Sequence, residues 1–209
     1  ASSSSIYGVK EGIKVTEDVK AEPLTDYSKY KLMCEDILRE KGDGLEWTVI
    51  RPATVCGYAS RLRLDVVVNI LTINALEKGV IKVFGGPQLR PNIHIDDMVD
   101  AYIALLEAPK EKIHGEAFNA GGENFTVDEL AQKIQSVAPA RIEHYETNDP
   151  RSYHEDSSKI KERLGFEAKR SIESAVESLV EAHRKGKIVD GLNNPMFHNI
   201  RRMKELNVQ

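Results

Sequence analysis

The feature that most restricts the fold is a capped helix followed directly by a buried strand. Thr25 precedes a helical stretch as its N-cap and Gly42 supplies the stop signal, so we expect a helix over 25–41. Residues 45–55 then alternate in side-chain polarity and are rich in Trp, Thr, Val and Ile, which predicts a buried strand. The segment 51–57 leaves the carboxyl end of that strand, where open α/β sheets bind ligands.

Helices and strands continue to follow one another along the chain. We expect a loop over the site at 9–22, a helix at 66–78 and a strand and turn at 81–86. Asp96 and Asp97 cap a helix to Leu106, a strand follows at 116–122, and a capping box at 126–129 opens a helix to about 137. Next come a strand at 141–145 and surface helices at 159–164 and 171–183, whereas the tail 186–209 has no assigned role.

Tyr27 and Lys31 are the most chemically suggestive pair in the predicted helix 25–41. They are four residues apart, so their side chains lie on one face, one turn apart. An ammonium beside a phenol favours the phenolate. Such a phenol is a proton donor and acceptor suited to the interconversion of a hydroxyl and a ketone.

Composition sets the broad class. With 209 residues, 41% hydrophobic and 30% charged, the chain can bury a core as one large domain or two small ones. The net charge of −4 is spread along the chain, so we expect no nucleic-acid or membrane partner. Cys34 and Cys56 lack metal-like spacing, which indicates free thiols, a reducing compartment and no metal. No stretch is typical of a membrane span or signal peptide, so a cytoplasmic location is expected.

Several motifs occur in a fixed order: the serine run 2–5 with Ile6-Tyr7-Gly8, then Tyr27 and Lys31, then the strand 47–52. They are followed by Arg90-Pro91-Asn92-Ile93-His94-Ile95-Asp96-Asp97, Phe118-Asn119-Ala120-Gly121-Gly122 and Asp149-Pro150-Arg151-Ser152-Tyr153. In this order and across nearly the whole chain, the motifs resemble the extended short-chain dehydrogenase/reductases, the branch of NAD-dependent nucleotide-sugar epimerases and dehydratases.

The resemblance implies an α/β fold that combines the C-terminal part of a Rossmann-type doubly wound parallel sheet with a small α/β substrate-binding domain. By resemblance, residues 1–57 and 90–122 form the second half of the NAD-binding domain. Residues 58–89 and 123–209 form the nucleotide-sugar domain. The helix with Tyr27 and Lys31 builds a homodimer interface in the family, so a homodimer is expected.

The resemblance also assigns a catalytic group. Tyr27 is the base, Ser3 bonds the same substrate oxygen, and Lys31 acts on the tyrosine and holds the cofactor ribose. All three contact the cofactor, which is NAD, with NADP as the open alternative. Pro52 lies against the nicotinamide.

Substrate contacts follow from the same resemblance, with a UDP-sugar as the first choice of nucleotide-diphosphate sugar. Thr54 stands where many relatives have asparagine, and Asn69 either meets a phosphate or faces outward. Phe84 lies beside the base or packs in the core, and Arg90 holds the diphosphate or is merely exposed. Relatives continue after the last motif with Arg-Val-Ser, whereas this chain has His154-Glu155-Asp156. The implied contacts are Ser4, Thr54, Asn69, Lys82, Phe84, Arg90, Asp149, Arg151 and Tyr153.

The chemistry favoured is C4 epimerisation through a transient 4-keto sugar. Dehydratase relatives carry an Asp-Glu pair where this chain has Ser4 and Ser5, which disfavours dehydration. An NAD(P)-dependent 4-ketosugar reductase uses the same three residues and stays open. Two non-catalytic alternatives are a nucleotide-sugar-binding fragment and a regulatory member of the superfamily.

The 209 residues contain no glycine-rich turn of the kind that seats a dinucleotide pyrophosphate. We therefore expect the chain to represent the C-terminal two-thirds of a longer enzyme. We also expect the isolated chain to bind nucleotide sugar with weak or absent turnover. Cys56 and His94 are interpreted as non-catalytic, His94 as structural.

Overall fold

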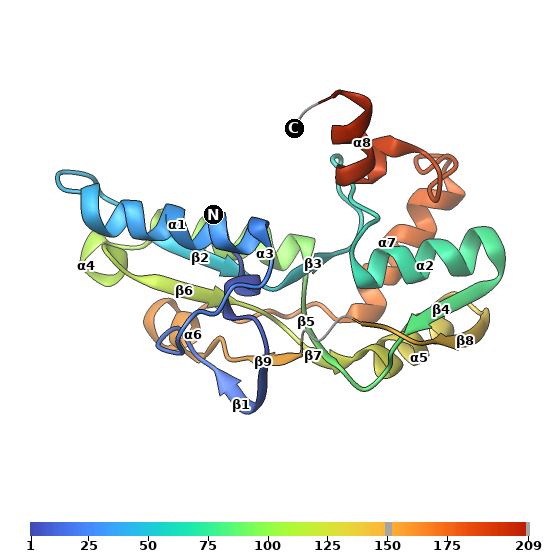
Figure 1. The fold of residues 1–209 in the computed structure, drawn as a ribbon, viewed down its shortest axis with the longest axis horizontal. Coiled ribbons are helices and arrows are strands. Elements are labelled where there is room, and N and C mark those ends of the chain that lie inside the picture. The colour runs from blue at the N-terminus through green and yellow to red at the C-terminus, as the bar shows by residue number, and fades with distance from the viewer. Residues whose placement is uncertain (149–151, 208–209) are drawn as a thin grey trace. The chain divides into compact units, whose positions relative to one another are not determined.

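The computed structural model describes residues 1–148 and 152–207 (Figure 1). The chain forms two compact units. Unit 1 comprises Ala1–Val55, Gln88–Asn124 and Asp149–Arg170, and unit 2 comprises Cys56–Pro87, Phe125–Asn148 and Ser171–Gln209.

Unit 1 is built on the parallel strand pair β2 (Val49–Pro52) and β6 (Ala117–Ala120), in which Ile50 lies opposite Phe118. Figure 1 shows α1 (Asp26–Lys41) and α3 (Ile95–Glu107) on one side of this pair and α6 (Ser158–Leu164) on the other. Ile50, Phe118 and Met98 are buried in one core cluster. Parallel strands with helices on both faces confirm the predicted α/β class.

Shorter elements complete unit 1. A single 3₁₀ turn, η1 (Ser4–Tyr7), follows the serine run, and α4 (Lys110–Ile113) follows α3. Strand β5 (Leu89–His94) lies between β3 (Thr54–Cys56) and β7 (Asn124–Thr126). Strand β1 (Lys10–Val15) pairs in parallel with β9 (Tyr153–Glu155).

The strand β1 corrects the loop expected at 9–22. Val15 is fully buried and packs with Ile6, Tyr7 and Tyr153. The partner strand lies about 140 residues further along the chain, so no local pattern could indicate it. Ile6 and Tyr7 belong to η1, and the chain turns at Gly8, which has a φ of 75°.

The predicted strand 45–55 is divided in two. Only Val49–Pro52 and Thr54–Cys56 are extended in ladders, whereas Leu45 is exposed and donates its N–H to Gly42 O at 3.0 Å. Trp47 is half-buried, and the centroid of its ring lies 6.1 Å from that of His114.

Unit 2 contains a second parallel pair, β4 (Val80–Phe84) with β8 (Arg141–Tyr145). Ile81 and Val83 are fully buried, while Lys82 and Phe84 point to the other face, as strand alternation requires. The buried side chains pack with helices α2 (Val67–Lys78), α5 (Val127–Val137) and α7 (Ile172–Arg184).

The tail without a predicted role forms η2 (Pro195–Phe197) and α8 (Asn199–Glu205). Leu64 N–H donates to Phe197 O at 2.8 Å, and Arg61 Nη1 donates to Met196 O at 3.1 Å. His198 is buried, with Nε2 2.9 Å from Gly191 O. The bonds at Leu64 and Arg61 join the tail to an earlier segment of unit 2, whereas the His198 bond lies within the tail.

Helix ends follow the predicted signals with one exception. Thr25 and Ser28 form a reciprocal capping box, Gly42 N–H donates to Leu38 O, and Thr126 with Glu129 caps α5. On α3 the N-cap is His94, whose Nδ1 accepts from Asp96 N at 3.1 Å, and not Asp96 or Asp97. The two acids lie in the first turn, as predicted, where their charge offsets the helix dipole. His94 has the structural role expected of it.

Residues 152–170, which the sequence analysis groups with the nucleotide-sugar domain, pack with unit 1. The cause is packing, because β9 pairs with β1 and Ile160 of α6 enters the core with Phe118.

Within the described part of the chain, no helix is both long and apolar enough to cross a membrane. No group of three or more His, Cys, Asp or Glu side chains among the same residues is arranged to hold a metal ion.

Candidate active site

The Tyr27–Lys31 pair lies on the first half of α1. The Lys31 ammonium is 5.8 Å from the centroid of the Tyr27 ring, and the Tyr27 side chain is exposed. The helix supplies this geometry through its four-residue spacing, and the Thr25 cap determines where its first turn begins. A phenol beside an ammonium is therefore accessible to a ligand.

The serine segment lies beside both α1 and β2. Lys31 Nζ donates to Ala1 O at 2.9 Å, and Ser2 N–H donates to Ile50 O at 2.8 Å. Ser3 is the N-cap of η1, and its half-buried hydroxyl lies 2.9 Å from Ser5 Oγ and accepts from Ser5 N. The structure thus brings the predicted Ser3 and Lys31 segments together, although they are distant in sequence.

Pro52 and Thr54 follow at the carboxyl end of β2 and the start of β3. Both are half-buried. This is the edge of a parallel sheet at which α/β proteins bind ligands.

Ser4 and Tyr153 form a buried pair of hydroxyl groups in unit 1. Their oxygens are 3.1 Å apart, and the two side chains are 1% and 7% exposed. The 149-residue separation is closed by the β1–β9 ladder, which places Tyr153 beside η1. Both residues were predicted at the substrate site from separate motifs.

Three predicted substrate contacts belong to unit 2. Asn69 is 2% exposed, accepts from Gly57 N at 3.0 Å and donates to Arg63 O at 2.7 Å, so the outward-facing alternative is wrong. Phe84 is 53% exposed and stacks on Tyr145 with centroids 5.2 Å apart, which excludes the core-packing alternative. Lys82 is half-buried on the same strand face. Their contacts with substrate stay predictions.

Of the predicted phosphate-site residues Arg90, Asp149 and Arg151, the structure describes Arg90. Arg90 lies in β5, half-buried, and its Nη1 donates to the Leu89 carbonyl at 3.1 Å. Asp149 and Arg151 lie outside the described residues, so their assignment stays a prediction.

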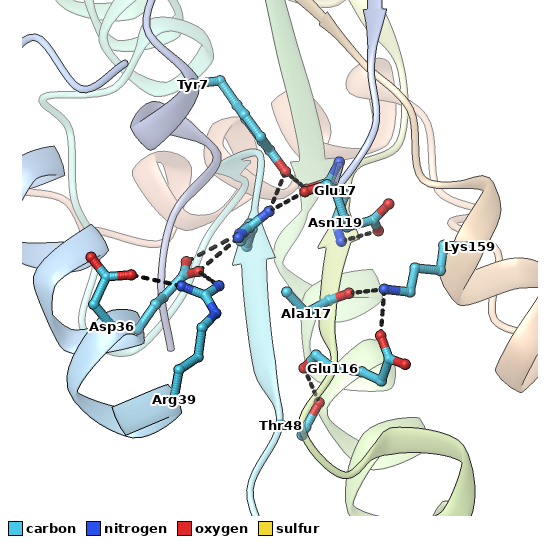
Figure 2. A network of polar contacts seen from close by, with 11 residues as sticks. Tyr7, Glu17, Asp36, Arg39, Thr48, Glu116, Ala117, Asn119 and Lys159 are labelled. Atoms are coloured by element: carbon cyan, nitrogen blue, oxygen red, sulfur yellow. Dashed lines mark hydrogen bonds and ion pairs between the residues drawn. The ribbon is translucent and has the colours of Figure 1, made fainter. Parts of the chain in front are cut away.

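A buried polar network beneath these residues was not predicted. Arg51 in β2 donates to both carboxylate oxygens of Glu35, at 3.1 and 2.7 Å, and to the Tyr7 hydroxyl at 2.7 Å. Tyr7 in turn donates to Asn119 Oδ1 at 2.7 Å (Figure 2). An arginine inside an apolar strand, and a glutamate four residues after Lys31, are the signals that would have indicated it.

A second buried carboxyl, Glu155, adjoins this network. Burial raises its pKa to about 8; the Ser4 and Ser157 hydroxyls and the Arg51 charge act against that rise, and the Glu17 charge adds to it. Burial also raises the pKa of Glu17, whose Oε1 accepts from Asn119 N at 2.6 Å. Within the described residues, Glu155 Oε2 has no hydrogen-bond partner.

A pocket of about 280 Å³ opens elsewhere in unit 1, beside the Gly121–Gly122 turn. Two cations line it, but Lys161 lies 2.6 Å from Glu167, and Arg170 lies 2.8 Å from Asp100. The pocket therefore has no excess positive charge that would favour a phosphate. Its other lining residues are Glu123, Ser157, Ser158, Ile160, Phe166 and Ala168.

Comparison with known proteins identifies the family. Residues 1–121, which include Ser3, Tyr27, Lys31 and the whole polar network, match the model of the NAD dependent epimerase/dehydratase family. The chain belongs to this family.

Individual epimerases and dehydratases are similar to the chain. The UDP-glucose 4-epimerase of Lactobacillus helveticus is 27% identical over 191 residues, covering 81% of this chain and 58% of the relative. The crystal structure of UDP-glucuronic acid 4-epimerase from Bacillus cereus, in complex with UDP-glucuronic acid and NAD, has a TM-score of 0.78 at 26% identity, covering 88% of this chain and 60% of that one.

The dTDP-glucose 4,6-dehydratase of Bacillus anthracis, solved with NAD, shares the fold. It has a TM-score of 0.77 at 21% identity and covers 92% of this chain and 63% of its own. The chain thus spans about 58% of the length of the curated epimerases it matches. The epimerase/dehydratase fold is therefore shown, and the choice of reaction rests on the site.

Proposed function

We propose that this chain carries the catalytic and sugar-binding part of a nucleotide-sugar C4 epimerase, with a UDP-hexose as substrate. The observation that carries the proposal is the Lys31–Ala1 hydrogen bond of 2.9 Å, because it holds the Tyr27–Lys31 helix against the segment that bears Ser3. The UDP-glucose 4-epimerases among its relatives support the same reaction.

In this proposal Tyr27 removes the proton from the sugar C4 hydroxyl and Ser3 hydrogen-bonds the same oxygen. Lys31 lies beside this base, with its ammonium 5.8 Å from the centroid of the Tyr27 ring. The side chains available around η1 are hydroxyls, since Ser5 contacts Ser3 and Ser4 contacts Tyr153. Positions 4 and 5 are serines and carry no carboxyl group that could serve as the acid or base of a water elimination. This favours epimerisation over dehydration.

The residues present fit one end of NAD. Lys31 on α1 would hold the ribose and Pro52, at the carboxyl end of β2, would lie against the nicotinamide. When bound, NAD supplies the hydride acceptor that the chain's own side chains lack. The pyrophosphate requires a glycine-rich turn, and the 209 residues contain none.

The test is binding selectivity at the C4 hydroxyl. Calorimetric titration compares UDP-glucose with UDP-4-deoxyglucose, which lacks only that hydroxyl. We expect UDP-glucose to bind about fivefold more tightly, the contribution of roughly one hydrogen bond. Equal affinity of the two ligands would contradict the proposed role of Ser3 and Tyr27.

We propose in addition that the enzyme is a homodimer formed through α1 and α3. Both helices expose large apolar side chains. Exposed apolar patches of this kind are typical of protein interfaces. The exposed side chains proposed for the interface are Tyr30, Met33 and Ile37 on α1 and Val99, Tyr102, Ile103 and Leu106 on α3.

A further inference from the structure

Arg51 is the centre of the buried polar network in unit 1. Its side chain is 5% exposed and uses all three guanidinium nitrogens. Nε and Nη2 bind the two oxygens of Glu35, which is 1% exposed, and Nη1 binds the Tyr7 hydroxyl and, at 3.1 Å, the Glu17 carbonyl. In Figure 2 the dashed lines join Tyr7, Glu17 and Asn119 on one side of the network to Arg39 and Asp36 on the other.

The protonation states of the network are fixed by its own contacts. Burial alone would raise the pKa of Glu35, but the bonds from Arg51 and Arg39 outweigh burial and lower it. Burial raises the pKa of Tyr7, so its hydroxyl keeps the proton that it donates to Asn119. An ion pair and a neutral phenol therefore persist over the whole physiological range.

A buried ion pair is a weak source of stability, because removing both charges from water costs about as much as their attraction returns. Its effect is geometric, since a planar guanidinium that binds a carboxylate with two bonds admits a narrow range of orientations. Arg51 therefore restricts the relative orientation of the elements that it joins more strongly than apolar packing would.

Those elements carry the three residues of the proposed function. Glu35 lies on the same face of α1 as Lys31, one turn later, and Tyr7 ends the turn whose N-cap is Ser3. We infer that Arg51 is a positioning residue that sets the Tyr27–Lys31 helix relative to Ser3 through Glu35 and Tyr7. The inference rests on the proposed function.

The test uses the 209-residue chain and the ratio of its affinity for UDP-glucose to its affinity for UDP-4-deoxyglucose, which reports only the contact at the C4 hydroxyl. The decisive variant is the double substitution Glu35→Leu/Arg51→Met, because paired apolar replacement of a buried ion pair tends to preserve the folded state. Tyr7→Phe is the second variant, removing one hydroxyl and leaving the ion pair intact. Thermal unfolding is followed for each.

Arg170→Met provides the matched control. Arg170 also binds a buried carboxylate in unit 1, with Nη1 2.5 Å from Asp97 Oδ1, but it belongs to a different cluster. The control removes the arginine partner of a buried acid, although Asp97 keeps its bonds from the backbone N–H groups of Lys169 and Arg170. It therefore reports what destabilisation alone does to the ratio.

We expect the ratio to fall from about five toward one in both network variants and to stay unchanged in Arg170→Met. If the folded double variant or the Tyr7→Phe variant keeps the original ratio, the positioning role of Arg51 is wrong, while the proposed function is unaffected. A ratio of one in the unmodified chain would overturn the proposed function and this inference with it.

Discussion

The buried carboxyl of Glu155 lies directly against the backbone of Gly121. A β-carbon at residue 121 would be 2.7 Å from Glu155 Oε1 and 3.3 Å from Ser157 Oγ. Gly121 N–H donates to that serine at 2.8 Å, so the turn after β6 closes over an acid that is 3% exposed. The contact makes the folded state sensitive both to the charge on Glu155 and to the size of residue 121.

Glu155 should make stability fall as pH rises. Burial raises its pKa from 4.5 to about 8, so the folded chain holds the proton more tightly than the unfolded chain. The stability contributed by the neutral acid is complete below pH 4.5 and is lost as the pH rises through about 8. Between pH 5 and 9 we expect the unmodified chain to lose a few kcal/mol more than Glu155→Gln.

Denaturant unfolding of both proteins across that pH range measures the difference. The comparison removes the contributions of all other titrating groups, which the two chains share. If the unfolding free energies of the two proteins changed with pH in parallel, the pKa of Glu155 would not be raised by its surroundings.

Gly121→Ala should destabilise the fold by roughly 1–3 kcal/mol, the usual cost of inserting a methyl group into a filled site. The cost should shrink when Glu155 is also changed to Ala, because the atom that the methyl group would meet is then gone. A double-mutant cycle by urea denaturation measures this coupling. If the destabilisations by Gly121→Ala and Glu155→Ala were additive, the added methyl group would not clash with Glu155.

The proposed dimer should dissociate when a charge enters its apolar face. Ile37→Asp places a carboxylate on the exposed stripe of α1, where desolvation on association would be costly. Leu45→Asp is the matched control, since Leu45 is equally exposed but lies outside α1 and α3. Sedimentation equilibrium should show monomers for Ile37→Asp and dimers for the control; a monomeric unmodified chain would contradict the assembly.

Loss of the α1 cap should weaken the helix that carries the proposed base. Thr25→Ala removes the acceptor for Ser28 N and should cost about 1 kcal/mol of unfolding free energy. Thr25→Ser keeps an oxygen at the same place and should restore most of that stability in thermal unfolding. Equal losses in the two variants would indicate that the methyl group, not the oxygen, matters.

Local signals predicted the local structure well. The Thr25 and Thr126 caps, the Gly42 stop and the short strand that begins the segment 81–86 each depend on a few neighbouring residues, and each is found in the structure. The order of the motifs also identified the family and the α/β class.

The unpredicted parts depend on contacts between distant segments. Strand β1 exists because of β9, and Arg51 sits in an apolar strand because Glu35 and Tyr7 meet it in the core. His94 caps α3 because its Nδ1 reaches Asp96 N, although acidic residues follow it. Sequence spacing alone does not predict these contacts.

The central claim is that Ser3 and Tyr27 share the C4 hydroxyl of a nucleotide sugar. Its most direct test is the calorimetric affinity of Tyr27→Phe and Ser3→Ala for UDP-glucose and UDP-4-deoxyglucose, compared with the unmodified chain. The account predicts that each substitution weakens UDP-glucose by about two- to threefold, a part of the hydroxyl's total contribution, and leaves UDP-4-deoxyglucose unchanged. If both ligands weaken equally, or neither does, these side chains do not hold that hydroxyl and the proposed active site is wrong.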